Sequence, residues 1–503
     1  MKISHDTSSI RLRAARRDAR IFAWILTSVL LGWGVVPDGR AACTTAICTG
    51  GNPCTISGTN NIDDGCILSF GSSQDVLVTG TMRTVNDDES FEIEAHSINI
   101  SGTLRARGDF GSITIETSGS GDPFIKTSGT GAIDVSKGGE LILDAAGTVE
   151  IAGGAIDADG GTGSCDGGDI TITGTSVVIT KAVHADGTSC GGAGGTITIT
   201  AFDTSVSLSG AGGVSANGGG SEYDGGTIAI DAITTISQGK AMHARGSGDG
   251  YGGAIGLASW STGATGLITV GGAMNASGGG SSESAGGSIT IDGGEVTTND
   301  TLTVNGGYYD AGTVDIIANG GAVDTNSGIS ADASNGGYGG WVQIVADDDV
   351  TIDGTISANG GGADSGGGTI DIAAGSNAQL TVNNVIEAKA SSNGAFDGTV
   401  MLDACDVVVD DTVRTRNTSV GLGINTVTYT GTLSVTSVGS LLADDPAATT
   451  CVGSANGNVI RCRCPDANND FICDSATCVS APTLTGTVTP TALVCPTAML
   501  ACS

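Results

Sequence analysis

One short phrase recurs along most of this chain. The stretch GGVSANGGGSEYDGGTIAIDA, which begins at Gly212, returns nearly unchanged as DGTISANGGGADSGGGTIDIAA from Asp353. Its GGxIxI part recurs about every 29 residues. A fixed period of this length indicates a solenoid, in which stacked units together bury a core that no unit could bury alone. The first apolar residues of the eleven copies are Ile113, Leu141, Ile170, Ile197, Ile228, Ile255, Ile289, Val314, Val342, Ile370 and Val400.

A second ladder keeps the same period. It consists of an apolar residue, a variable residue and a small residue, as in Val214-Ser215-Ala216. Both ladders alternate with a period of two, which is typical of strands, and a third alternating segment usually lies between them. We therefore expect an all-β fold: a right-handed parallel β-helix solenoid of about eleven coils, each with three short strands. We expect the many glycines to take positive φ angles at the corners and to let neighbouring coils approach closely.

The tandem GxIxAxGG…GGxIxI resembles the secreted β-helices of bacterial haemagglutinin-type adhesins and polymorphic surface proteins. The resemblance covers roughly residues 60 to 410 and rests on periodicity. It implies an exported surface or extracellular stalk, and it implies no particular ligand.

The first 41 residues are typical of an export signal. A basic head ends at Arg20, an apolar run covers residues 21–36, and we expect cleavage after Ala41. Two alternatives stay open: the apolar run as a retained membrane anchor, and Cys43 as a lipidated N-terminus. With the signal removed we expect no integral membrane segment. The sequence thus predicts an exported bacterial protein, extracellular or on the outer cell surface.

Charge and cysteine content narrow the choice of partners. The chain has a formal net charge of −33, and removal of the basic signal makes it more negative. Such a field repels nucleic acid and anionic membranes, so both are excluded as partners. Fourteen cysteines, an even number, in an exported chain predict disulfides.

Cysteine-bearing segments flank the repeats. We divide the chain into a signal peptide (1–41), an N-terminal cysteine-containing cap with the first coil (42–95), the β-helix repeats (96–410), and C-terminal strands with a cysteine-rich tail (411–503). A cap is expected because an exposed coil end is an unpaired sheet edge that invites aggregation.

Aromatic residues recur in one glycine-rich loop of the coils, four or five residues before the corner Ile or Val, and acidic residues accompany them. An aromatic ring can stack on the C–H face of a sugar while a carboxylate accepts hydrogen bonds from its hydroxyls, so the column is a candidate glycan-binding surface. The partner would then be an extracellular polysaccharide or a cell-surface glycan. The alternative is that each ring shields the glycines of its own corner. The candidates are Tyr223, Tyr251, Tyr309, Tyr338 and Phe396.

An acidic cluster is expected where two successive coils meet. Asp157 and Asp159 should lie one coil before His184 and Asp186. Carboxylates this close to an imidazole could bind a cation or act as acid and base, although structural decoration is the alternative that we favour. Nearby, Cys165 and Cys190 occupy the same loop of successive coils, and we expect a disulfide between them.

The tail contains a candidate calcium loop, CPDANNDFICDSATC. Its oxygen-bearing residues Asp466, Asn468, Asp470 and Asp474 stand at relative positions 1, 3, 5 and 9, a spacing that resembles the calcium loops of EF-hand-like and thrombospondin type 3 modules. Phe471 and Thr477 depart from that pattern, so a plain disulfide-bounded turn is the alternative. Calcium is the one cofactor that the sequence suggests.

Two functions remain. The first is an exported acidic rod with a structural or adhesin-like role, binding glycans along the Tyr/Asp loop face. The second is a polysaccharide-active enzyme, a lyase or a hydrolase, that uses the Asp/His cluster. We find no nucleophile elbow, zinc motif or phosphate-binding loop, and we assign no catalytic residue, because fold alone does not give function.

Overall fold

The computed structural model describes residues 48, 51–108, 110–163, 165–280, 283–362, 365–391, 398–415, 423–436 and 438–442, and the backbone of four short strands between residues 454 and 488. The expected signal peptide and the calcium loop of Asp466, Asn468, Asp470 and Asp474 lie outside the described residues. Residues 42–503 form one compact unit, and only this unit is described below.

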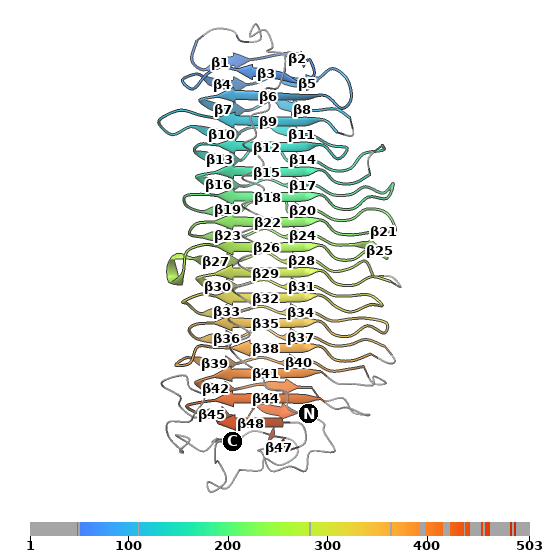
Figure 1. The fold of residues 1–503 in the computed structure, drawn as a ribbon, viewed down its shortest axis with the longest axis vertical. Coiled ribbons are helices and arrows are strands. Elements are labelled where there is room, and N and C mark those ends of the chain that lie inside the picture. Colours follow the sequence, from blue (N-terminus) through green and yellow to red (C-terminus); the bar gives the residue numbers. More distant parts are fainter. Residues whose placement is uncertain are drawn as a thin grey trace, which may run out of the picture. The chain divides into compact units, whose positions relative to one another are not determined.

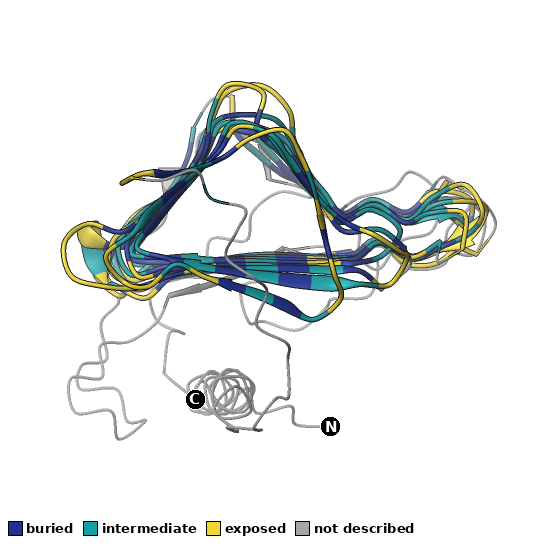
Figure 2. Cartoon of the chain, turned by 90° about the horizontal axis from the view of Figure 1, so that it is seen from above, coloured by how far each residue is buried: buried dark blue, intermediate teal, exposed yellow. Residues whose placement is uncertain are grey.

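The described chain is a parallel β-solenoid, as the sequence predicts. Its strands form three sheets of sixteen strands each, and every third strand belongs to the same sheet along almost the whole stack (Figure 1). The strands of this unit enclose a triangular interior, with a long extension at one corner (Figure 2).

Sheet one contains β1 (Cys54–Ile56), β4 (Asp75–Val78), β7 (Ser97–Ile100), β10 (Phe124–Thr127), β13 (Thr148–Ile151), β16 (Ser176–Ile179), β19 (Val206–Leu208), β23 (Ile236–Gln238), β27 (Leu267–Val270), β30 (Glu295–Thr298), β33 (Val323–Thr325), β36 (Val350–Ile352), β39 (Gln379–Val382), β42 (Asp406–Val409), β45 (Leu433–Val435) and β49 (Thr483–Leu484).

Sheet two contains β2 (Thr59–Ile62), β5 (Thr81–Thr84), β8 (Thr103–Arg105), β11 (Ala132–Asp134), β14 (Ile156–Asp157), β17 (Val183–His184), β20 (Val214–Ser215), β24 (Met242–His243), β28 (Met274–Asn275), β31 (Leu302–Thr303), β34 (Ile329–Ser330), β37 (Ile356–Ser357), β40 (Ile386–Glu387), β43 (Thr412–Arg414), β46 (Ser440–Leu442) and β50 (Thr487–Val488).

Sheet three contains β3 (Cys66–Ser69), β6 (Ser90–Ala95), β9 (Ser112–Thr117), β12 (Glu140–Ala145), β15 (Asp169–Gly174), β18 (Thr196–Ala201), β22 (Thr227–Ala232), β26 (Ala254–Ser259), β29 (Ser288–Gly293), β32 (Thr313–Ala318), β35 (Trp341–Ala346), β38 (Thr369–Ala373), β41 (Thr399–Ala404), β44 (Ile424–Tyr429), β48 (Asn458–Cys462) and the antiparallel β47 (Ser454–Ala455). Two further strands, β21 (Glu222–Tyr223) and β25 (Ser247–Gly248), form a small antiparallel pair, and the described helical content is the short 3-10 helix η1 (Gly263–Thr265).

Alternation within each strand builds the core. In β18 the side chains of Ile197 and Ile199 are fully buried, while Thr196, Thr198 and Thr200, which alternate with them, face outward. The strands pair in register, so that Ile197 lies directly between Ile170 and Ile228 of the neighbouring coils. Each such side chain contributes about 1.5–3 kcal/mol of hydrophobic stabilisation. One continuous column of apolar side chains therefore fills the interior.

The solenoid is longer than the expected eleven coils, because each sheet has sixteen strands. The sheets also extend beyond the repeat region predicted for residues 96–410. Before it, β1 and β4 pair in register, and after it β44 pairs with β41. These outer coils alternate like the others but lack the glycine phrase by which the copies were counted.

The corner extension, which we call the wing, consists of the connections from sheet two to sheet three. In each coil an outgoing arm leaves a strand of sheet two, and a returning arm enters a strand of sheet three; β21 and β25 lie in it (Figure 1). The described wing connections are residues 158–168, 185–195, 216–226, 244–253, 276–287, 304–312, 331–340 and 358–368, apart from the residues excluded above.

The paired glycines of the repeat stand at the neck of the wing. A Cβ atom on Gly194 would lie 2.0 Å from the carbonyl oxygen of Ala216, and one on Gly195 would lie 2.0 Å from the carbonyl oxygen of Gly168. Neither glycine has a positive φ angle. Our expectation of positive φ angles is therefore wrong for these pairs. Close approach of the backbones requires glycine here, whereas positive φ angles occur elsewhere, as at Gly191 and Gly220.

Among the described residues we find no apolar helix long enough to cross a lipid bilayer.

Candidate functional site

At the neck of the wing, where the outgoing and returning arms of a coil meet, one backbone carbonyl bonds to the opposite arm instead of to the next coil. The N–H of Ala158 donates to the carbonyl of His184, so a regular parallel ladder would also have the N–H of Asp186 donate to the carbonyl of Ala158. That carbonyl instead accepts the N–H of Gly168, on the returning arm of the same coil, at 2.7 Å. The N–H of Asp186 donates to Oδ1 of Asp159 at 2.7 Å. A side chain thus replaces the lost backbone acceptor.

The same exchange recurs along the wing. The neck bonds join the carbonyl of an outgoing Ala or Val to a returning Gly N–H, in the pairs Ala185–Gly195, Ala216–Gly226, Ala244–Gly253, Ala276–Gly287, Val304–Gly312, Ala331–Gly340, Ala358–Gly368 and Ala388–Gly398. The side-chain oxygens that accept the released N–H groups form an acceptor column. Its acceptor-to-donor pairs include Asp186–Asn217, Asn217–Arg245, Ser277–Asn305, Asn305–Asp332, Asp332–Asn359 and Asn359–Lys389.

Where a residue of the column lacks an acceptor atom, the released backbone N–H of the next coil finds another acceptor. Arg245 stands in the column and has no acceptor atom in its side chain. In the next coil the N–H of Ser277 donates to Oδ1 of Asn275 on its own strand, at 2.9 Å. Arg107 occupies the equivalent position near the N-terminus, and the N–H of Ser136 in the next coil donates to Asp134. The polar residues of the SANGG phrase are therefore parts of the scaffold.

The expected acidic cluster lies in this column. The structure brings Asp157, Asp159, His184 and Asp186 to adjacent positions of β14 and β17 and the arms that follow them, with Asp157 directly opposite His184. Oδ1 of Asp157 accepts the N–H of Asp159 at 3.0 Å. Burial, opposed by the hydrogen bond from the Asp186 N–H, raises the pKa of Asp159 to about 6. The cluster is partly buried and takes part in the backbone ladder.

His184, Asp186 and Ser215 bring together a serine, a histidine and a carboxylate. Their hydrogen bonds, however, differ from those of a catalytic triad, because the serine hydroxyl donates to the carboxylate. Oγ of Ser215 donates to Oδ2 of Asp186 at 2.7 Å, and Nδ1 of His184 lies 2.8 Å from the same Oγ. An activated serine would instead direct its proton to the imidazole. Ser215 is also only 5% exposed. This geometry holds the arm of the coil and does not present a nucleophile.

Cys165 and Cys190 form a disulfide between two successive wing connections. Their equal place in successive coils led us to expect this pair. A second described disulfide joins Cys48 to Cys54 at the N-terminal end, and Cys405 is a free thiol.

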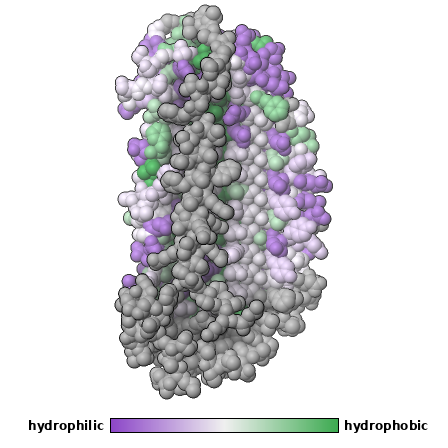
Figure 3. Space-filling view, in the orientation of Figure 1, coloured by the Kyte–Doolittle hydropathy of each residue, from purple (hydrophilic) through white to green (hydrophobic). Residues whose placement is uncertain are grey.

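The aromatic column lies on the wing. The side chains of Tyr223, Tyr251, Tyr309 and Tyr338 are exposed, and Tyr308 and Trp341 beside them are exposed too, with exposed fractions between 39% and 52%. Phe396, the fifth candidate, lies outside the described residues. In the face shown in Figure 3 the described surface is mainly hydrophilic or neutral, and apolar residues are scattered over it.

Carboxylates next to these rings also bind backbone N–H groups. Oδ1 of Asp224 accepts the N–H of Tyr251 at 2.7 Å, and Oδ1 of Asp310 accepts the N–H of Tyr338 at 3.0 Å. These bonds fix the backbone of each exposed tyrosine to the coil before it. One oxygen of each carboxylate is therefore used by the fold.

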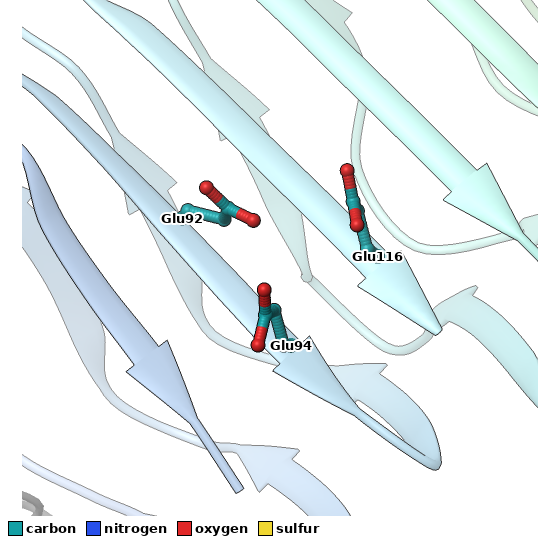
Figure 4. A group of neighbouring side chains, drawn as sticks. All are labelled: Glu92, Glu94 and Glu116. Atoms are coloured by element: carbon teal, nitrogen blue, oxygen red, sulfur yellow. The ribbon is translucent and has the colours of Figure 1, made fainter. Parts of the chain in front are cut away.

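The sequence analysis missed a group of three glutamates on the outer face of sheet three. Carboxylate oxygens of Glu92, Glu94 and Glu116 lie within 4.8 Å of one another, a spacing at which a cation can be held (Figure 4). Burial raises the pKa of Glu116, and the charges of Asp144 and Glu94 raise it further. The available signal was Glu-x-Glu alternation in β6 followed by Glu116 directly opposite Glu94, but β6 precedes the first copy of the glycine phrase, which lies in β9.

In comparisons with protein-family models, curated proteins and solved structures, nothing matches this chain. The fold and the wing must therefore be interpreted from their own geometry.

Proposed function

We propose that this chain is an exported β-solenoid rod with a structural or adhesin-like role, and that the tyrosine-bearing wing binds glycans. The observation that carries the proposal is the set of half-exposed aromatic rings gathered on one connection of successive coils. Exposed rings in such number normally mark a contact surface, because isolated soluble domains expose few large aromatic side chains together. Disulfides between successive segments are compatible with an exported location.

The acidic net charge of −33 favours a neutral or cationic glycan over an acidic one. The alternative of a polysaccharide-active enzyme would use the Asp/His cluster. Against it, Oδ1 of Asp159 and both carboxylate oxygens of Asp186 accept hydrogen bonds within the ladder. The rod is therefore the function that the geometry supports best.

A single experiment separates the two proposals. The secreted chain is incubated with neutral, cationic and acidic polysaccharides in calcium-containing buffer, and each mixture is analysed by size-exclusion chromatography. Co-elution with polymer of unchanged length is the expected result. Shortened polymer that requires Asp159 or His184 would support the enzyme instead, and no co-elution with any polymer would contradict glycan binding.

A further inference from the structure

The tyrosines of the wing belong to two equivalent groups that lie three coils apart. In the first group the carbonyl of Tyr223 packs against Gly250, where an added Cβ would lie 1.9 Å from the oxygen. The N–H of Tyr251, the next residue, donates to Asp224. We call Tyr223, Asp224, Gly250 and Tyr251 module I.

The second group repeats these contacts. A Cβ on Gly337 would lie 2.1 Å from the carbonyl oxygen of Tyr309, and the N–H of Tyr338 donates to Asp310. We call Tyr309, Asp310, Gly337 and Tyr338 module II.

The coil that follows each module also repeats. It carries a fully buried serine, Ser284 after module I and Ser365 after module II, and each serine hydroxyl donates to a carbonyl of its own connection at 3.0 Å. The wing thus has a period of three coils superimposed on the single-coil period. In the sequence it is visible as YDGG, GYGG and SAGG followed by YDAG, GYGG and SGGG.

One ring of each module is packed against a neighbouring group, a glycine in module I and a second tyrosine in module II. An added Cβ on Gly191, in the coil before module I, would lie 2.6 Å from Cε2 of Tyr223. Beside module II, the ring of Tyr308 forms an edge-to-face pair with that of Tyr309, and an added Cβ on Gly336 in the next coil would lie 3.5 Å from Cε2 of Tyr308. Rings that are already positioned lose little conformational entropy when a ligand stacks on them.

The spacing and charge of the modules restrict the ligand. Coils stack about 4.8 Å apart, so equivalent rings of the two modules are separated by about 14 Å along the solenoid axis. A linear polymer that runs parallel to this axis would meet both modules. An extended β-1,4-linked polysaccharide fits this requirement, because the length of one sugar unit is close to the spacing of one coil. Carboxylates at both modules exclude a polymer with acidic groups.

We propose that modules I and II are two copies of one binding site, and that together they hold a single linear, non-acidic β-1,4-linked polysaccharide along the wing. The inference rests on the proposed glycan binding and adds to it the class of ligand, its direction and the number of sites. Joint engagement by one chain gains affinity from effective concentration, roughly 10²-fold or more over one module.

Isothermal titration of the full chain with uncharged β-1,4-linked oligosaccharides of two to eight units tests this. Each wild-type chain should bind two short oligomers. It should bind only one long oligomer, with an affinity roughly 10²-fold higher than that of a short one. Tyr251→Ala and Tyr338→Ala should each remove one short-oligomer site and reduce the long-oligomer affinity to that of a short one. Trp260→Ala, an exposed ring in the connection from sheet three to sheet one, is the matched control and should change neither value.

Thermal melts of the variants check that they fold, and Tyr251→Phe and Tyr338→Phe should retain binding because the stacking face is kept. Binding that neither tyrosine variant affects would overturn the two modules while leaving the proposed glycan binding intact. A single short-oligomer site, or equal affinity for short and long oligomers, would overturn them as well. No binding of any oligosaccharide would overturn both proposals.

Discussion

At the scale of single residues, the polar positions of the repeat satisfy backbone groups that the fold would otherwise leave without partners. A buried N–H without an acceptor costs about 1–3 kcal/mol, which favours Asp, Asn or Ser at this position in most copies. The acceptor column therefore explains why the phrase recurs without requiring a ligand.

Replacing Asn305 by Leu should destabilise the protein by about 1–2 kcal/mol. Oδ1 of Asn305 accepts both the N–H of Asp332 and the hydroxyl of Ser330, and Leu leaves both without this acceptor. Asn305→Ser is the matched control, because Ser277 performs the same task one coil earlier. Denaturant unfolding measures both variants, and equal stability of the Leu and Ser variants would show that the acceptor is dispensable.

Asp159→Asn should stabilise the protein at pH 7. The pKa of Asp159 is raised from its ordinary value of 3.8 to about 6, so the folded state binds a proton between these values and the unfolded state does not. Stability of the wild type should therefore fall as the pH rises through this window. The amide avoids the cost of a partly buried charge and still accepts the N–H of Asp186, a gain of the order of 1 kcal/mol. Melting temperatures of the wild type and of Asp159→Asn, measured from pH 4 to 7, should converge at the acidic end. A difference that does not change with pH would contradict the raised pKa of Asp159.

At the scale of elements, the neck glycines determine how closely neighbouring coils pack. Gly195→Ala should destabilise the protein by about 3 kcal/mol or more, because the added methyl group collides with rigid backbone on the adjacent coil. Gly256→Ala in β26 is the matched control, since nothing lies within 4 Å of its added Cβ. Chemical denaturation of both variants provides the test, and similar stabilities would refute close approach as the reason for the glycine pair.

His96 connects three successive coils near the N-terminal end. Its Nδ1 lies 2.9 Å from Oδ1 of Asp75 and its Nε2 lies 3.2 Å from the carbonyl of Ser120. The hydrogen bond to Asp75 is the main reason that the pKa of His96 is raised, followed by the bond to Ser120. Its contribution to stability is therefore complete below the ordinary pKa and is lost as the pH rises through the raised one.

Hydrogen exchange of β7 and β10 at pH 6 and pH 8.5 measures this effect, after correction for intrinsic exchange rates. Protection should decrease at the higher pH in the wild type and stay constant in His96→Gln. The same pH dependence in both proteins would assign it to another group.

At the scale of the whole molecule, the sequence predicted the solenoid because its signal is local and periodic. Alternation around Ile197 and the interval between copies are sufficient for that inference, and the equal placement of Cys165 and Cys190 suggested their disulfide. Pairing of Ala158 with Gly168 could not be inferred in this way, because it depends on which carbonyl turns away from the ladder. The group of Glu92, Glu94 and Glu116 was not predicted, because β6 precedes the first copy of the phrase in β9, so the register between these two strands could not be inferred from the repeat. The calcium loop at Asp466 remains a prediction.

The central claim is that the repeated polar residues build the scaffold whereas the tyrosine modules bind the ligand. The most direct test is co-sedimentation with an insoluble neutral β-1,4-linked polysaccharide, comparing the wild type, the double variant Tyr251→Ala with Tyr338→Ala, and the variant Asp159→Asn. We predict that the tyrosine variant loses binding, that the Asp159 variant binds like the wild type, and that no soluble fragments are released. Binding that requires Asp159 and survives loss of both tyrosines, or release of fragments, would contradict the account.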